Sequence, residues 1–145
     1  MPFAFSLAAV QAVRRQRERQ EERALSAVLH EMQQTRLTLE RIEAELRQAG
    51  ASRLRAEPQP MQGVSLHEQY ARMELLRQAW AEVLARLEEL ATQRDQQQGS
   101  YLTARRDREL LDELEQKQKT SFEAKLLQQE QKRNDDLFLA RRLRR

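Results

Sequence analysis

The fold is decided first by residues 25–49, which read LSAVLHEMQQTRLTLERIEAELRQA. Apolar or small side chains recur there at alternating intervals of three and four residues: Leu25, Val28, Met32, Thr35, Leu39, Ile42, Leu46 and Ala49. A second run has the same spacing: Met73, Leu76, Trp80, Val83, Leu87 and Leu90. A repeat of about 3.5 residues is that of two helices that wind around each other along a narrow stripe. The spacing therefore predicts a coiled coil.

The residues that break helices mark its boundaries. Pro58 and Pro60 lie between the two runs, and Gly50 has the position of a left-handed helix C-cap. Ser65 and Glu68 have the spacing of a capping box. We expect a first helix over about 4–49, a connector over 50–64 and a second helix over about 65–142.

The expected fold is all-α: one domain, 1–145, forming a long antiparallel two-stranded coiled-coil hairpin with a C-terminal helical overhang. The same stripes could pair between chains in a swapped dimer, but the prolines and the capping box favour the closed hairpin. In the closed form the apolar layers would pair Ile42 with Met73, Leu25 with Leu90 and Thr35 with Trp80. Arg14 would then lie over Tyr101 and Glu18 near Gln97, and residues beyond about 111 would have no counterpart.

The composition excludes several classes of protein. Charged residues make up 34% of the 145-residue chain and aromatic residues 5%, so a multilayer core is not expected. With no cysteine there is neither a disulfide framework nor a thiolate metal site. No apolar run approaches the ~18 residues needed to span a bilayer. The apolar start at 3–13 has its positive charges after it, which argues against a signal peptide.

The chemistry-bearing side chains form no catalytic pattern. The two histidines, His30 and His67, are expected to be solvated, and the acidic pairs are helix neighbours. No phosphate-binding loop and no zinc spacing is present. We therefore expect a non-enzymatic protein with no catalytic residue, cofactor or metal. Because acids and bases alternate and the net charge is only +3, no nucleic-acid partner is expected either.

Two features are unusual for a merely stable hairpin. From Arg14 to Arg23 no side chain is apolar, which indicates either a hydrated stretch that allows bending or a tolerated polar interruption. The chain also opens with large apolar groups: Phe3, Phe5, Leu7, Val10 and Val13. In the predicted register these lie beside residues 101–111, an arginine-fringed end where a protein could dock.

The same ends resemble the FliJ family of flagellar export proteins. The carrying motifs are the aromatic start FAFSL at 3–7, the RRQRERQE run at 14–21 and RDRELLDELEQK at 106–117, followed by EQKRNDD at 130–136. The resemblance implies a cytoplasmic coiled coil, peripheral at the inner membrane through its partners. Those partners would be the hexameric export ATPase, the cytoplasmic domain of the export gate and export chaperones.

The resemblance also assigns regions. The terminal end would face the ATPase, with the candidate residues Phe5, Leu7, Arg14, Arg15, Arg105, Arg106, Arg108, Glu109 and Leu114. The part near the connector would face the gate, through Tyr70, Arg72 and Met73. Alternatives are the equivalent stalk protein of a virulence type III secretion system and a generic coiled-coil scaffold or RNA-binding rod that uses the basic C-terminus.

Overall fold

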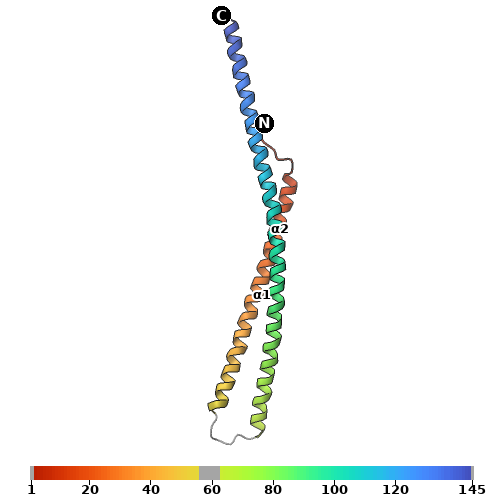
Figure 1. Cartoon of the computed structure of the whole chain (residues 1–145), viewed down its shortest axis with the longest axis vertical. Coiled ribbons are helices and arrows are strands. Elements are labelled where there is room, and N and C mark those ends of the chain that lie inside the picture. The colour runs from red at the N-terminus through yellow and green to blue at the C-terminus, as the bar shows by residue number, and fades with distance from the viewer. Residues whose placement is uncertain (1, 56–62, 145) are drawn as a thin grey trace. The chain divides into compact units, whose positions relative to one another are not determined.

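The computed structural model describes residues 2–55 and 63–144, and its regular structure there is entirely helical (Figure 1). Helix α1 runs over Ala8–Arg55 and has 48 residues. Helix α2 runs over Gly63–Leu143 and has 81 residues. The all-α prediction is confirmed, with two long helices packed against each other. In this described part no helix carries an apolar stretch long enough to cross a membrane.

The contacts divide the chain into two compact units. Unit 1 joins Met1–Glu21 to Tyr101–Arg145, and unit 2 is Glu22–Ser100. Each unit therefore contains a part of α1 and a part of α2.

The predicted stripe forms the interior of unit 2. All fourteen residues of the two runs are buried or half-buried. Met32, Ile42 and Leu90 are the best shielded of them. Apolar residues one step off the stripe, such as Leu29 and Leu37, stay exposed. A helix that offers one face to one neighbour can shield only positions three and four residues apart, so the spacing of the side chains decides which are buried.

The register of unit 2 differs from the predicted one. The indole Nε1 of Trp80 donates to Glu43 Oε1 at 3.3 Å, about two turns from Thr35, the expected neighbour. Arg86 Nη2 lies 2.6 Å from Glu31 Oε1, so the partners in α2 run in the opposite order to those in α1. Apolar layers of similar residues fit in several registers, whereas a half-buried indole N–H needs an acceptor, and the carboxylate of Glu43 supplies it.

Helix α1 begins later and ends later than predicted. Its start is fixed by the hydrogen bonds from Ala8 N to Phe5 O and from Gln11 N to Leu7 O, at 3.2 and 2.9 Å. Gly50 is not a C-cap, because the helix continues through it to Arg55 without a left-handed φ. One glycine costs a helix only about 1 kcal/mol, and the residues after it favour helix.

Helix α2 begins two residues before the predicted start and ends one residue after the predicted end. The connector prolines Pro58 and Pro60 lie outside the described residues, and so does the Ser65 side chain of the expected capping box.

In unit 1 the paired part of α2 extends further than predicted. Asp112 and Glu115 both accept hydrogen bonds from Gln11, so pairing does not stop near residue 111. The ring of Phe3, in the non-helical start of the chain, packs on Phe122 with ring centroids 5.6 Å apart. From 123 to 144 every residue is exposed. The overhang therefore begins after Phe122, about three turns later than expected.

Replacing Gly50 by alanine tests the end of α1. A methyl group added there meets no atom within 4 Å, so Gly50→Ala should stabilise the chain by about 0.5–1 kcal/mol. A left-handed C-cap would instead make this substitution destabilising. Urea denaturation followed by circular dichroism measures the sign. Gly99→Ala, which is also inside a helix, is the positive control.

Truncating the best-buried leucine tests the interior of unit 2. Leu90 is 0% exposed and Leu75, on the same helix, is 66% exposed. We expect Leu90→Ala to lower the free energy of unfolding by about 2–5 kcal/mol, because it removes buried methyl groups and leaves a cavity. Leu75→Ala should change it by less than about 0.5 kcal/mol. Equal losses in the two variants would contradict the observed stripe.

Candidate functional site

The stripe of shielded positions continues into unit 1, but there most of its side chains are polar. The shielded residues are Leu7, just before α1, and Gln11, Arg14, Glu18 and Glu21 in α1. In α2 they include Tyr101, Ala104, Arg108, Leu111, Glu115, Gln118 and Phe122. We call five of the polar members, Gln11, Arg14, Glu18, Arg108 and Glu115, the polar seam. The stretch without apolar side chains that begins at Arg14 therefore does not interrupt the helix pairing in unit 1. It replaces apolar contacts between the helices with polar ones.

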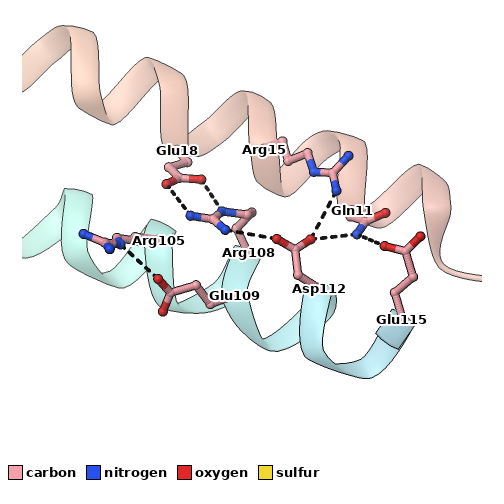
Figure 2. A network of polar contacts seen from close by, with 8 residues as sticks. All are labelled: Gln11, Arg15, Glu18, Arg105, Arg108, Glu109, Asp112 and Glu115. Atoms are coloured by element: carbon pink, nitrogen blue, oxygen red, sulfur yellow. Dashed lines mark hydrogen bonds and ion pairs between the residues drawn. The ribbon is translucent and has the colours of Figure 1, made fainter. Parts of the chain in front are cut away.

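Arg108 is the centre of the polar seam. Its Nε and Nη2 donate to the two carboxylate oxygens of Glu18 at 2.6 and 3.1 Å, and its Nη1 donates to Asp112 Oδ2 at 3.0 Å (Figure 2). The Arg108 and Glu18 side chains are only 26% and 15% exposed. A two-pronged ion pair screened from water is stronger and more directional than a surface pair. It therefore fixes α1 against α2 in this register.

Gln11 completes the seam next to that ion pair. It is 5% exposed, and its Nε2 donates to Asp112 Oδ1 at 2.7 Å and to Glu115 Oε2 at 2.6 Å (Figure 2). Arg15 Nη2 adds a longer contact to Asp112 Oδ1 at 3.3 Å. Among the described residues no buried side-chain nitrogen or oxygen lacks a partner. The buried nitrogens and oxygens of the polar seam are thus all hydrogen-bonded, which is what burial of polar groups requires.

The ion pairs change the protonation equilibria of the seam. The hydrogen bond from Arg108 holds the pKa of Glu18 below its ordinary value. The hydrogen bonds to Glu18 and then to Asp112 raise the pKa of Arg108. Partial burial raises the pKa of Asp112, but hydrogen bonds from Arg108, Gln11 and Arg15 outweigh that effect and lower it. All three groups are therefore held in their charged forms.

Most candidate residues of the terminal end come together in unit 1. Phe5, Leu7, Arg14, Arg108 and Glu109 are half-buried. Arg14 Nη1 pairs with Asp107 Oδ2 at 2.8 Å instead of lying over Tyr101, and Glu18 pairs with Arg108 instead of approaching Gln97.

Four further candidates lie at the surface of unit 1, among them Arg15, whose contact with Asp112 is given above. Arg105 is exposed and pairs within its own helix with Glu109 at 2.9 Å. Arg106 is exposed and has no ion pair with any described residue. Leu114 is exposed as well.

The remaining candidates lie in unit 2. Tyr70 and Arg72 are exposed and Met73 is half-buried. Within unit 2, Arg72 and Met73 line a groove between α1 and α2, together with Glu45, Gln48, Ala49, Ser52 and Gln69. The structure thus separates the two predicted sets into different units.

Sequence reasoning missed four residues of the network: Gln11, Glu18, Asp112 and Glu115. The signal was present, because continuing the intervals of three and four from Leu25 back toward the N-terminus reaches Glu18 and Gln11. The predicted register was continued to Glu18, but it set Glu18 near Gln97, so its pair with Arg108 was not found. Over residues 2–55 and 63–144 no group of His, Asp or Glu is arranged to hold a metal ion.

A chain built from two long helices that meet along one narrow stripe is a coiled-coil-like protein. Its sequence matches the family described as the flagellar FliJ protein over residues 3–145, and the chain belongs to that family. It is therefore a protein of flagellar, type III-related export. No curated protein and no solved structure matches it.

Acidification tests the Glu18–Arg108 pair. The pKa of Glu18 is lower in the folded chain than in the unfolded chain. The ion pair therefore contributes fully to the free energy of unfolding above the ordinary glutamate pKa of about 4.3, and this contribution is lost as the pH falls through the lower pKa of the folded chain. We expect the wild-type chain to lose about 1 kcal/mol more stability than Glu18→Gln between neutral pH and roughly pH 3. Urea denaturation at several pH values measures the difference.

Glu113→Gln is the matched control, because Glu113 is exposed on the same unit. This variant should keep the acid sensitivity of the wild-type chain. An identical acid response of wild type and Glu18→Gln would show that the pair contributes nothing.

Proposed function

We propose that the chain is an antiparallel two-stranded coiled-coil hairpin that acts as a non-enzymatic component of the flagellar type III export apparatus. In this proposal it binds the hexameric export ATPase, helps it assemble, and links it to the export gate and the export chaperones. It would work in the cytoplasm and reach the inner membrane only through those partners. Family membership over residues 3–145 supports the proposal, and so does the reversed order of the helix contacts within each unit.

The observation that carries the proposal is the polar seam of unit 1. Glu18, Arg108 and Gln11 occupy positions where leucine would give a more stable pair of helices, since a well-buried leucine contributes roughly 1.5–3 kcal/mol. Charged pairs at such positions contribute little net stability but fix one register. A helix pair held in one register is suited to presenting side chains to a partner at defined positions.

The proposed ATPase contact is formed by unit 1. Arg15, Arg106 and Leu114 are exposed and would touch the partner directly. Arg14 and Arg108 already form ion pairs with Asp107 and Glu18, so they would mainly position the helices. The other members of the proposed set are Phe5, Leu7, Arg105 and Glu109.

The proposed gate contact is formed by Tyr70, Arg72 and Met73 in unit 2. The groove beside Arg72 and Met73 is open and mixed in polarity, and Tyr70 is half-exposed. An exposed tyrosine and an arginine next to an apolar group are typical of protein interfaces.

The ATPase contact can be tested with the purified full chain and the purified cognate hexameric ATPase. We expect the chain to bind the hexamer and to raise its rate of ATP hydrolysis. Arg106→Glu should weaken binding about tenfold, because it reverses an exposed charge without breaking an ion pair in the described structure. Circular dichroism checks that the variant stays helical.

Arg36→Glu makes the same charge reversal at an exposed position of unit 2 and should behave as wild type. If the wild-type chain neither binds the hexamer nor changes its hydrolysis rate, the proposed function is wrong. If both variants lose binding equally, the contact is not specific to unit 1.

A further inference from the structure

One side of unit 1 exposes a group of large apolar side chains. Val10 and Val13 on α1 are 42% and 63% exposed, and Leu110 and Leu114 on α2 are 64% and 37% exposed. We call these four residues the apolar side. Single exposed leucines are common on proteins, so the grouping matters more than any one exposure.

The heptad positions place all four residues on the same side of the seam. Val10 directly precedes the seam residue Gln11, and Leu114 directly precedes the seam residue Glu115. In an antiparallel pair, residues that precede such positions in the two helices flank the seam together. The contacts from Gln11 to Glu115 bring these parts of α1 and α2 together.

The remaining two residues extend this surface along each helix. Val13 lies three residues after Val10, and Leu110 lies four residues before Leu114. These are the spacings that put side chains next to each other on one helix face.

The opposite side of the same seam is closed by ion pairs. Arg15 and Asp112 each directly follow a seam position, and they pair with each other at 3.3 Å (Figure 2). Arg105 and Glu109 pair nearby at 2.9 Å. On that side the charged groups are already paired with each other, so a partner that bound there would have to break existing ion pairs. The apolar side requires no such exchange.

The border of the apolar side has an unbalanced positive charge. Arg17, Arg106 and Lys117 are exposed and have no ion pair with a described residue. The nearby Asp107 is already paired with Arg14, which leaves Glu113 as the exposed acid in this region. Apolar groups between free cations favour a partner that carries apolar groups between carboxylates.

We propose that the apolar side is a docking surface for an amphipathic helix with acidic flanks, supplied by another protein. A third helix can pack along the flank of two packed helices by ridges-into-grooves packing. The apolar side presents four apolar side chains over about one turn of α1 and one turn of α2. These can pack against the apolar stripe of an amphipathic partner helix. This surface shares Leu114 with the proposed ATPase contact but goes beyond it, because it adds Val10, Val13 and Leu110 and requires only the chemistry of the helix and not its source.

The test uses the full chain, labelled on its valine and leucine methyl groups, and a synthetic helical peptide. The peptide carries leucines at intervals of three and four residues with glutamates on both flanks. We expect methyl shifts on titration at Val10, Val13, Leu110 and Leu114. A second peptide with lysines in place of the glutamates should bind at least about tenfold more weakly. Shifts at other residues only, or equal binding of the two peptides, would overturn the proposal.

Matched double variants localise the surface. Val13→Ser with Leu110→Ser should weaken binding of the acidic peptide at least about tenfold. Leu29→Ser with Leu37→Ser, at residues 47% and 49% exposed in unit 2, should leave it unchanged. All four positions are exposed, so the variants should stay folded, which circular dichroism verifies. Equal loss in both double variants would also overturn the proposal.

A third arm addresses a different occupant. Vesicles of anionic phosphatidylglycerol that compete with the acidic peptide and shift the same methyl groups would show a lipid-binding surface and overturn the proposal. The peptide result is independent of the ATPase experiment, so either proposal can fail while the other holds.

Discussion

A helix in which about a third of the residues are charged can shield only one narrow stripe, and every other feature of this chain depends on that limit. Shielded positions therefore occur at intervals of three and four residues along both α1 and α2. In unit 2 these positions hold Met32, Ile42 and Leu90, and burial of apolar surface holds the helices together. In unit 1 they hold Gln11, Glu18 and Arg108, so the same geometry is maintained by hydrogen bonds and ion pairs instead.

The two kinds of stripe have different energetic roles. An apolar stripe contributes most of the stability but discriminates weakly between registers, because one leucine layer resembles the next. The pair formed by Arg108 and Glu18 loses much of its energy to desolvation, yet it is satisfied only when the two side chains face each other. Unit 2 therefore stabilises the fold, while unit 1 fixes side chains relative to one another. The apolar side of unit 1 is positioned by this register.

The sequence predicted an all-α fold of two long packed helices, the shielded positions from Leu25 to Ala49 and from Met73 to Leu90, and the family. It did not predict the register, because Thr35 opposite Trp80 is sterically reasonable and only the hydrogen bond to Glu43 distinguishes the observed pairing. The end of α1 was also placed too early, since Gly50 at a helix end and Gly50 inside a helix have the same local sequence signal. The network around Arg108 was missed because its residues look like solvated charges until the partner helix is placed.

The hydrogen bond of Trp80 has a practical consequence for spectroscopy. It is the only tryptophan of the chain, and its indole donates to Glu43 across the two helices of unit 2. Separation of those helices would remove the acceptor and expose the ring to water, changing the wavelength and intensity of its fluorescence. Intrinsic indole emission thus monitors the opening of unit 2 and carries no direct signal from unit 1. A ligand that acts only on the polar seam would be optically silent in such an assay, and an added fluorophore would be needed to observe it.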